Sequence, residues 1–453
     1  MKKNHCLFSK VNFLFIAGAF CYYISLPPFG FWFLVFLVPV FWTFVIEHPT
    51  QIRFRTIYFG AFCFWIASAW WLVSPHPLAI SGLLYLSIYW CLFFSASRIA
   101  VHNFCVPIIF AVPVCWIGCD YLRNHILGGF SFCSLEHALY RQPLLIQIAD
   151  IGGGYFVGGM IMLVGVGVAS GLGSLRIHKK SINRNSYIWC FFAGFIFIIT
   201  IGYGFFQTAG FRISKSESNL TVAALQGNIP NKDLDRTIKT LKQLIDLTKK
   251  AVQNAQTEKQ PLDLIIFPEI ACPIFLLKYN SDLKPAEFDG WTDKAADYWE
   301  DRFEQLQIFV QKLGVPVLVG LSTWEFEKPP KPKQLNSAML IDPKNNRTEY
   351  RYDKMRLVIF GEYLPFRKYL PENFFLNKLC QEIGSGTEPV AIPLDGGRLF
   401  LSVNICSQNT MPHLIRNQIL TLKKQGKEPA ILVNMSNDSW FDFSQQIDQH
   451  LAT

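Results

Sequence analysis

The first half of the chain is dominated by long runs of hydrophobic residues with few charges between them. Each run is about 15–20 residues long, close to the ~20 residues with which an α-helix crosses a ~30 Å hydrocarbon layer. The runs lie at residues 11–25, 31–46, 57–73, 79–96, 105–121, 152–172 and 187–206. The pattern predicts a membrane domain over residues 1–207 with about seven transmembrane helices.

The first run has a second interpretation, because Lys2, Lys3 and Lys10 form the basic start that a secretory signal peptide also has. No small-residue cleavage site follows, however, and the next hydrophobic run begins at once. We therefore interpret the first run as a membrane span.

The basic residues between the runs predict the orientation of this domain. Alternate gaps between runs hold ten of them, namely Lys2, Lys3, Lys10, Arg53, Arg55, Arg98, Arg176, Lys179, Lys180 and Arg184. The intervening gaps hold only Arg123 and Arg141. Because short cytoplasmic loops carry an excess of Lys and Arg, we expect a cytoplasmic N-terminus. An odd number of spans then places everything after Tyr203 on the opposite side, which is the periplasm in a cell with two membranes.

The second half of the chain follows a different pattern. Residues 208–219 form a polar linker, after which short apolar runs alternate with amphipathic stretches. The apolar runs predict strands at 220–225, 263–267, 316–321, 337–342, 400–405 and 430–434. The amphipathic stretches predict helices at 232–255, 294–313 and 412–424. Such alternation predicts a layered α/β domain over residues 220–453.

Composition and charge agree with a membrane protein and exclude several classes. The chain has 453 residues, of which 51% are hydrophobic and only 17% are charged. The net charge of +9 comes without a basic stripe interleaved with aromatics, so we expect no nucleic-acid partner. Of the 12 cysteines, only Cys272, Cys380 and Cys406 follow the membrane domain, and none has metal-ligand spacing. We therefore expect neither a disulfide framework nor a metal.

Three residues in the second half have the chemistry of a thiol nucleophile. Cys406 ends the apolar run that begins at Leu399, Glu269 ends the run 264–269, and Lys354 follows Tyr352 and Asp353. A thiol attacks as the thiolate, which needs a base, and the resulting oxyanion needs a cation and an N–H donor. We assign Glu269 as the base, Lys354 as the oxyanion partner and the N–H of Ser407 as a second donor. Taken singly, each residue also fits a structural role, as a core cysteine, a loop carboxylate and a solvated lysine.

The sequence motifs around these residues resemble those of the bacterial apolipoprotein N-acyltransferase family, a membrane-anchored branch of the nitrilase or carbon–nitrogen hydrolase superfamily. The matching words span most of residues 220–451, namely Ala224-Leu-Gln-Gly-Asn-Ile-Pro230, Phe267-Pro-Glu269, Tyr352-Asp-Lys354, Phe360-Gly-Glu-Tyr-Leu-Pro365, Ile405-Cys406, Asn434-Met-Ser-Asn-Asp-Ser-Trp-Phe441 and Gln449-His-Leu451. The resemblance implies an α-β-β-α nitrilase sandwich, a catalytic triad of Glu269, Lys354 and Cys406, and a functional role for Glu362.

The resemblance also implies an activity and its partners. Family members act in the bacterial inner membrane, with the catalytic domain in the periplasm and no cofactor. They transfer an acyl chain from a phospholipid through a cysteine thioester to the α-amine of a diacylglyceryl-modified apolipoprotein. We expect the same reaction from a monomer here. Two alternatives remain open: an inactive or truncated copy of the enzyme, and a membrane-tethered amidase that lets water resolve the thioester.

The sequence departs from the family at four places. The family's Tyr-Glu after the cysteine is Ser407-Gln408, an expected tryptophan is Asp235, and an expected glycine is Asp442. Family members also continue beyond the Gln-His-Leu word, whereas this sequence stops at Thr453. We interpret that end as a truncation that removes the last strands and the last membrane helix.

Overall fold

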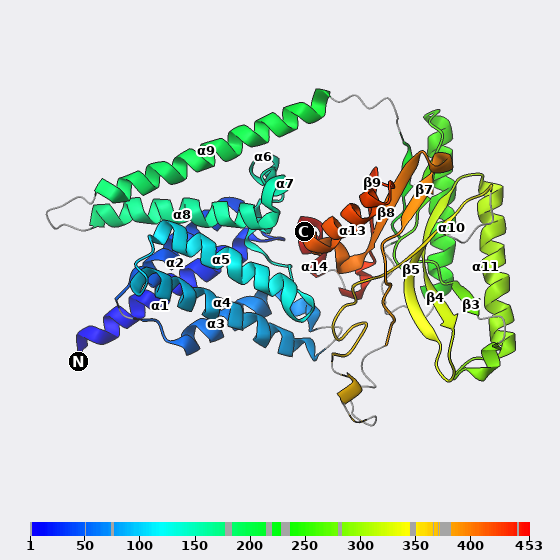
Figure 1. Cartoon of the computed structure of the whole chain (residues 1–453), viewed down its shortest axis with the longest axis horizontal. Helices are drawn as coiled ribbons and strands as arrows, with labels where there is room; N and C mark the ends of the chain where they lie inside the picture. Colours follow the sequence, from blue (N-terminus) through cyan, green and yellow to red (C-terminus); the bar gives the residue numbers. More distant parts are fainter. Residues whose placement is uncertain are drawn as a thin grey trace. The chain divides into compact units, whose positions relative to one another are not determined.

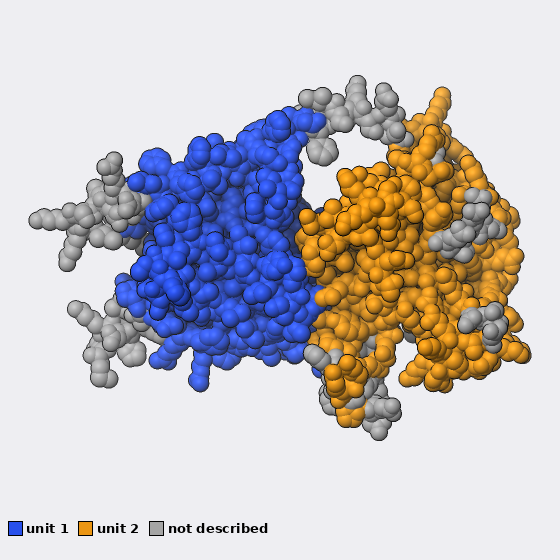
Figure 2. Space-filling view, viewed as in Figure 1, with its two compact units in different colours: residues 1–215, 443–453 blue, residues 216–442 orange. Residues whose placement is uncertain are grey.

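The structure is a computed structural model of the chain. It describes residues 2–453 except 50, 74–76, 177–183, 214–219, 228–235, 280–282, 345–349, 366, 370, 372–381 and 442–443. Cys380, Asp235, Asp442 and the end of the predicted linker lie outside the described residues. The chain divides into a helical unit of residues 1–215 with 443–453, and an α/β unit of residues 216–442 (Figure 2).

The helical unit contains the hydrophobic runs. Its helices are α1 Lys2–Ser25, α2 Leu37–Glu47, α3 Phe54–Ala69, α4 Ala79–His102, α5 Ile108–His125, α6 Pro143–Ile146, α7 Ala149–Gly152, α8 Gly154–Arg176 and α9 Arg184–Ile213. Short 3-10 turns lie between them, among them η1 Trp32–Phe36, η2 Trp70–Leu72, η3 Ile126–Gly128 and η4 Leu135–Leu139. Each of the seven predicted runs therefore lies largely in helix.

Among the described residues, three helices are long and apolar enough to cross a membrane by length and composition: Ala79–His102, Gly154–Gly173 and Tyr187–Gly210. Shorter apolar helices cover Lys10–Ser25, Trp32–Glu47 and Pro143–Gly152. The number of seven spans remains a prediction.

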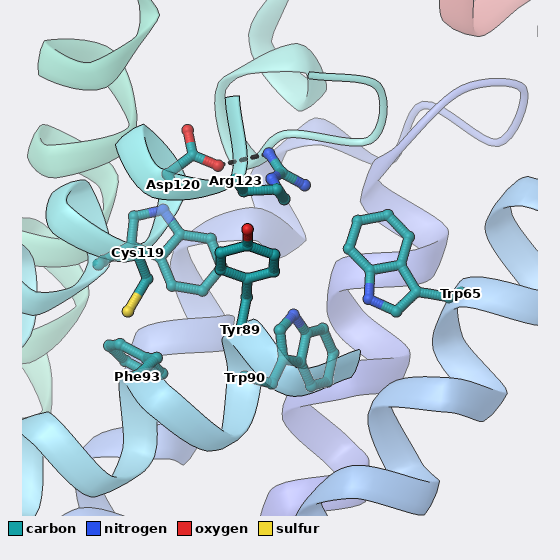
Figure 3. A pocket seen from close by; sticks show the side chains of 8 residues that line it. Trp65, Tyr89, Trp90, Phe93, Cys119, Asp120 and Arg123 are labelled. Atoms are coloured by element: carbon teal, nitrogen blue, oxygen red, sulfur yellow. Dashed lines mark hydrogen bonds and ion pairs between the residues drawn. The ribbon is translucent and has the colours of Figure 1, made fainter. Parts of the chain in front are cut away.

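Aromatic side chains form the centre of the helical unit. Trp42 is fully buried and packs against Phe15, Tyr22, Trp90 and Phe94, with ring centroids 4.8–6.5 Å away. Beside this core lies a small pocket of about 20 Å³, large enough for about one water molecule. It is lined by Trp65, Tyr89, Trp90, Phe93, Trp116, Cys119, Asp120 and Arg123 (Figure 3). The guanidinium of Arg123 pairs with Asp120 one helical turn earlier in α5.

The α/β unit contains two sheets. The larger runs in the order β1-β2-β4-β5-β6, with β3 pairing with β4. Its strands are β1 Val222–Ala224, β2 Leu264–Ile266, β3 Phe275–Tyr279, β4 Val317–Phe326, β5 Lys333–Ile341 and β6 Arg351–Asp353. The smaller sheet runs in the order β7-β8-β9, with β7 Ala391–Leu394, β8 Leu399–Ile405 and β9 Ile431–Met435.

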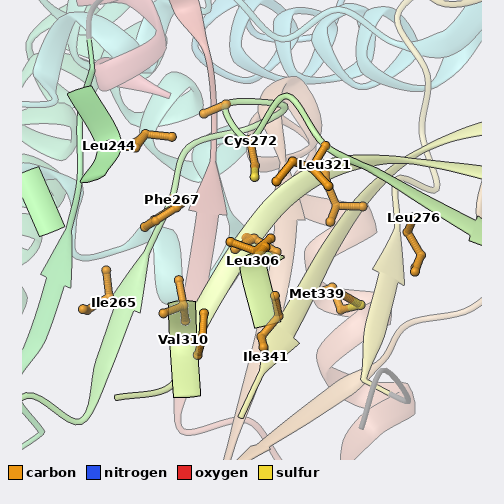
Figure 4. Close-up of a cluster of buried hydrophobic side chains, with 14 residues drawn as sticks. Leu244, Ile265, Phe267, Cys272, Leu276, Leu306, Val310, Leu321, Met339 and Ile341 are labelled. Carbon is orange, nitrogen blue, oxygen red and sulfur yellow. The ribbon is translucent and has the colours of Figure 1, made fainter. Parts of the chain in front are cut away.

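Two hydrophobic layers hold these sheets and their helices together. On one face of the larger sheet, α10 (Arg236–Thr257) and α11 (Asp293–Leu313) contribute Leu244, Leu306 and Val310 to a buried cluster (Figure 4). On the other face, side chains such as Leu318 pack against the smaller sheet. Helix α13 (Pro412–Lys424) covers the outside of that sheet, where Gln418 donates to the backbone of β8 (Figure 1). The layers are helix, sheet, sheet and helix, so the predicted α-β-β-α fold is confirmed.

The alternation of side chains along β4 explains this layering. Val317, Val319 and Leu321 belong to the cluster under α10 and α11, whereas Leu318 belongs to the cluster between the sheets. Because successive side chains of a strand point to opposite faces, a strand covered on both sides reads as a continuous apolar run. The sequence pattern identified β4 for this reason, but it missed the short or more polar strands β3, β6 and β7.

The end of the chain makes its contacts within the helical unit. By these contacts residues 443–453 cluster with that unit, while the extent of the predicted α/β domain over residues 220–453 stays a prediction. This end segment includes α14 (Gln446–Ala452), whose buried residues include Gln449 and His450.

Candidate active site

The three predicted catalytic residues follow three different strands of the α/β unit. Glu269 lies three positions after β2, Lys354 directly follows β6, and Cys406 directly follows β8. Glu269 and Lys354 are 6% and 1% exposed. A buried carboxylate and a buried ammonium are costly unless they are paired, so their partners decide whether the site is stable.

The carboxylate of Glu269 is fully engaged. Its Oε1 accepts hydrogen bonds from Asn336 Nδ2 at 2.8 Å and Lys354 Nζ at 3.4 Å, and its Oε2 accepts from the Asn437 backbone N–H at 3.2 Å. The chain reaches this position by crossing Gly320 of β4, where an added Cβ would lie 2.4 Å from the Pro268 carbonyl oxygen. Glycine at 320 is therefore what lets the loop carrying Glu269 lie against the sheet.

The ammonium of Lys354 lies between two carboxylates. Its Nζ is 3.4 Å from Glu269 Oε1 and 2.8 Å from Glu362 Oε1. Burial alone would lower the pKa of Lys354, but the negative charges of the Glu269 and Glu362 carboxylates outweigh burial and raise the pKa above its ordinary value. Lys354 is therefore a permanent cation at neutral pH.

Glu362, which accepts from Lys354 through Oε1, is itself held in place by Val358. Its Oε2 accepts a hydrogen bond from the Val358 N–H at 2.8 Å, and its own backbone N–H donates to the Val358 carbonyl oxygen at 2.8 Å. These bonds close a tight turn in which Phe360 has φ +65°. Predicted as a functional residue, Glu362 thus contacts Lys354 directly.

The backbone of Cys406 is in a conformation that non-glycine residues rarely adopt. Cys406 has φ +54° at the point where β8 turns into the 3-10 turn η8 (Cys406–Thr410), and Ile270, next to Glu269, has φ +43°. Left-handed backbone at a non-glycine residue costs about 1–3 kcal/mol and is concentrated at functional sites. At Cys406 the chain leaves the extended conformation of β8 and enters the turn η8.

The thiol of Cys406 is neutral at rest. Burial raises the pKa of Cys406 above its ordinary value, the nearby carboxylate of Glu269 raises it further, and Lys354 opposes both. The same charges show that the thiol lies within electrostatic range of both other residues. A thiol in this environment reacts only if a base removes its proton during the attack.

The second predicted donor, the N–H of Ser407, lies at the start of η8. Amides in the first turn of a helix have no partner within it, so this N–H is available to an incoming oxygen. The Ser407 carbonyl oxygen accepts a hydrogen bond from Thr410 Oγ1 at 2.8 Å, which holds the turn closed.

Gln408 contributes a support that the sequence did not predict. Its side chain is fully buried, and its Oε1 accepts from the Ile405 N–H at 2.9 Å and from Tyr352 Oη at 3.1 Å. Ile405 precedes the thiol and Tyr352 lies two positions before Lys354. One amide oxygen therefore ties β8, which Cys406 follows, to β6, which Lys354 follows.

Asn336 and the Asn437 N–H are further site groups without a predicted role. Asn336 lies within β5, where no local pattern distinguishes it from any other strand residue. Asn437 belongs to the motif at residues 434–441 that resembles the family, and this motif was the only sequence feature that pointed to it. No group of three or more His, Cys, Asp or Glu side chains suited to a metal occurs among the described residues.

Comparison with known proteins agrees with this fold. The carbon-nitrogen hydrolase family model matches residues 221–453, which makes the α/β unit a domain of that class. The model of the apolipoprotein N-acyltransferase N-terminal domain matches residues 18–167. The chain belongs to the apolipoprotein N-acyltransferase family, as the resemblance predicted.

Two curated relatives of that name are similar to this chain over 77% or more of its length. The apolipoprotein N-acyltransferase of Rhodopirellula baltica is 26% identical over 96% of this chain and 82% of its own length. That of Geobacter metallireducens is 28% identical over 77% of this chain and 60% of its own. Among solved structures, a carbon-nitrogen hydrolase from Helicobacter pylori G27 is 19% identical over 48% of this chain and 58% of its own, with a TM-score of 0.27.

Proposed function

We propose that this protein transfers an acyl chain from a membrane phospholipid, through a thioester on Cys406, to the α-amine of a diacylglyceryl-modified apolipoprotein. The observation that carries the proposal is the buried group of Glu269, Lys354 and Glu362 within electrostatic range of the strained Cys406. Its relatives are named for the same activity. The apolar helices of the first half suit a donor that resides in the bilayer.

In the first half-reaction, Cys406 Sγ attacks the ester carbonyl carbon of the phospholipid while Glu269 takes the thiol proton. The tetrahedral oxyanion is stabilised by the positive charge of Lys354 Nζ and by a hydrogen bond from the Ser407 N–H. The ester C–O bond then breaks, and the leaving alkoxide takes the proton from Glu269. The products are an acyl thioester on Cys406 and a lysophospholipid.

In the second half-reaction, the amine of the apolipoprotein attacks the thioester carbonyl carbon and Glu269 accepts the proton that the amine loses. The same two donors hold the second oxyanion. The C–S bond breaks, an amide forms, and the proton returns to the Cys406 sulfur. Glu362 acts on both steps by holding Lys354 in place.

Location follows from the same proposal. We infer a multi-pass protein of the bacterial inner membrane, with a cytoplasmic N-terminus and the α/β unit in the periplasm, because the basic residues are divided ten to two between alternate gaps. Labelling by a membrane-impermeant thiol reagent in intact cells tests this orientation. A cysteine engineered on the α/β unit should react and one near Lys180 should not, and the reverse result would refute the orientation.

The thioester is tested by incubating the protein with phospholipid that carries a labelled acyl chain. We expect a protein adduct that hydroxylamine releases and that is absent from Cys406→Ala. Glu269→Gln should slow adduct formation by about 10²-fold or more, because it removes the general base. An undiminished adduct in Cys406→Ala would refute the mechanism.

The fate of the adduct separates acyl transfer from the alternative of an amidase. Addition of a diacylglyceryl-cysteine peptide should move the label into an amide on the peptide amine. Release of the label only as free fatty acid would favour a hydrolase, and the absence of any adduct would favour an inactive copy.

A further inference from the structure

The small pocket of the helical unit is bordered by three helices. Cys119, Asp120 and Arg123 of α5 line it together with Trp65 of α3 and Tyr89 of α4 (Figure 3). The three residues of α5 are spaced three and four positions apart, so their side chains share one side of that helix. Asp120 and Arg123 are only 6% and 5% exposed. The wall that α5 contributes is therefore polar, although it has almost no contact with bulk solvent.

Two buried N–H groups at this pocket need an acceptor. Among the residues that the structure describes, neither Trp65 Nε1 nor Arg123 Nε has a hydrogen-bond partner. Arg123 Cζ lies 5.5 Å from the centre of the Trp65 ring, and Figure 3 shows the indole nitrogen of Trp65 on the side that faces Trp90. The described part of the chain offers no partner to Trp116 Nε1 either, but this atom lies 3.6 Å from where a Cβ on Gly158 would be, on the side of α8. Because a buried donor without an acceptor is unfavourable, we expect an acceptor inside the pocket.

The size and charge of the pocket select the kind of acceptor. Its volume of about 20 Å³ is enough for one water molecule and too small for a lipid headgroup. Asp120 already balances the charge of Arg123, so no net positive charge attracts an anion. The carboxylate accepts from Arg123 through Oδ1, and an ionised carboxylate can accept at both oxygens. The ligand is therefore small and neutral, and it both accepts and donates hydrogen bonds.

We propose that this pocket binds one water molecule, which accepts hydrogen bonds from Trp65 Nε1 and Arg123 Nε and donates to the Asp120 carboxylate. About three polar partners are usual for a buried water. The other nitrogens of Arg123 donate to the Phe132 carbonyl oxygen and to the Ser134 hydroxyl. The water thus completes the hydrogen bonding of a guanidinium that joins α5 to the segment after it, and it adds a connection to α3.

X-ray radiolytic labelling of the full-length protein in detergent tests the proposal. Irradiation ionises bound water in place, and the hydroxyl radicals modify the side chains beside it even where bulk solvent has no access. We expect Trp65 to be modified several-fold faster than Trp42. Trp42 is the matched control, because it is an equally buried indole whose Nε1 donates to the Phe15 carbonyl oxygen at 3.3 Å. Equal rates at Trp65 and Trp42 would overturn the proposal.

A second internal control separates bound water from access of bulk solvent. Phe64 is 5% exposed, its ring centroid lies 5.3 Å from that of Trp65, and it does not line the pocket. Opening of α3 to solvent would expose both side chains, whereas a water in the pocket modifies only Trp65. Modification of Phe64 in proportion to Trp65, after correction for intrinsic reactivity, would therefore refute the site.

Substitutions at Cys119 change the room in the pocket. Cys119→Val adds roughly the volume that one water molecule occupies in the liquid, about 30 Å³, and should lower modification of Trp65 to the rate at Trp42. Cys119→Ala leaves the space open and should keep the modification of Trp65. Persistent modification in folded Cys119→Val would contradict the proposal. If Cys119→Val does not fold, the comparison of Trp65 with Trp42 and Phe64 in the unaltered protein still decides.

A change of buffer salt distinguishes water from an anion. Gluconate is too large for the pocket, and a water site needs no salt, so modification of Trp65 should be the same in chloride and in gluconate. Faster modification in gluconate would mean that chloride had occupied the pocket, and would overturn the proposal. None of these measurements depends on acyl transfer.

Discussion

The helical unit and the α/β unit expose opposite kinds of side chain. On α9 of the helical unit, Phe195 and Ile198 are 61% and 68% exposed, whereas α11 of the α/β unit buries Leu306 and Val310 and exposes most of its charged residues. An apolar outer surface suits lipid and a polar one suits water. Hydrophobic residues therefore have different roles in the two units. In the helical unit many of them form the outer surface, whereas in the α/β unit they mark the side of a helix that faces the core.

The two units also bury a cation in different ways. In the helical unit, Arg123 pairs with Asp120 of the same helix. In the α/β unit, Lys354 pairs with Glu269, which is 85 positions away, and with Glu362. The Arg123–Asp120 pair lies within one helix, with further acceptors at Phe132 and Ser134 nearby in the chain, whereas the partners of Lys354 come from distant segments of the sandwich. Buried charge in the α/β unit therefore depends on tertiary structure and is concentrated where we place the chemistry.

The largest expected effect comes from removing each of these cations. Lys354→Met should lower the rate of Cys406 acylation by at least about 10³-fold, because the oxyanion loses its cation and two carboxylates are left facing each other. Arg123→Met should reduce the yield of folded protein without changing the rate constant of the folded fraction. Single-turnover labelling after purification measures both quantities. Equal loss of rate constant in the two variants would contradict the contrast between the units.

An arginine on the outer surface tests the two solvents directly. Ile198→Arg, near the middle of the apolar helix Tyr187–Gly210, should cost about 2.5–3.5 kcal/mol if that surface faces lipid. Leu432→Arg, at a 50% exposed position on β9, should change stability by no more than about 0.5 kcal/mol. Thermal unfolding in detergent and membrane-insertion assays measure the two. Similar small costs at both positions would refute a lipid-facing α9.

A methyl group at Gly320 tests the approach of the Glu269 loop to the sheet. Gly320→Ala would place Cβ 2.4 Å from the Pro268 carbonyl oxygen, so the loop has to move. We expect acylation to slow by about 10²-fold, since small misplacement of a catalytic group has effects of this size. Gly194→Ala in α9 is the matched control, because nothing lies within 4 Å of its added Cβ. Normal acylation in Gly320→Ala would show that the loop has room to adjust.

The smallest expected effect concerns Gln408. Gln408→Leu removes the acceptor shared by Ile405 and Tyr352 and should cost about 1–3 kcal/mol of unfolding free energy, because a buried N–H loses its acceptor. Tyr352→Phe removes one of the two bonds and should cost less. Chemical denaturation of both single variants and the double variant gives the coupling between them. If the losses of unfolding free energy in the two single variants simply add in the double variant, Gln408 does not tie the two strands together.

Much of the fold was predictable because its signals are local. Hydrophobic runs are visible without neighbours, and strands buried on both faces, such as β4 and β8, are recognised as apolar runs. The short strands β3, β6 and β7 were missed, because three to five residues carry little local preference and their pairing partners decide their structure. The contacts of Gln445 and Gln449 with α3 were not predicted for a similar reason, since they leave no trace in a local pattern.

The side chains of the proposed chemistry were recognisable without a structure, since Glu269, Lys354 and Cys406 end or follow predicted strands and occur in an order that resembles one family. How these side chains are supported was not recognisable from the sequence. Asn336, Gly320, Gln408 and the Asn437 N–H are brought to the site by strand pairing and loop crossing between distant parts of the chain. The physical reason is that a reactive group is recognisable by its own chemistry, whereas a supporting group is defined only by the partner that folding brings within hydrogen-bonding distance.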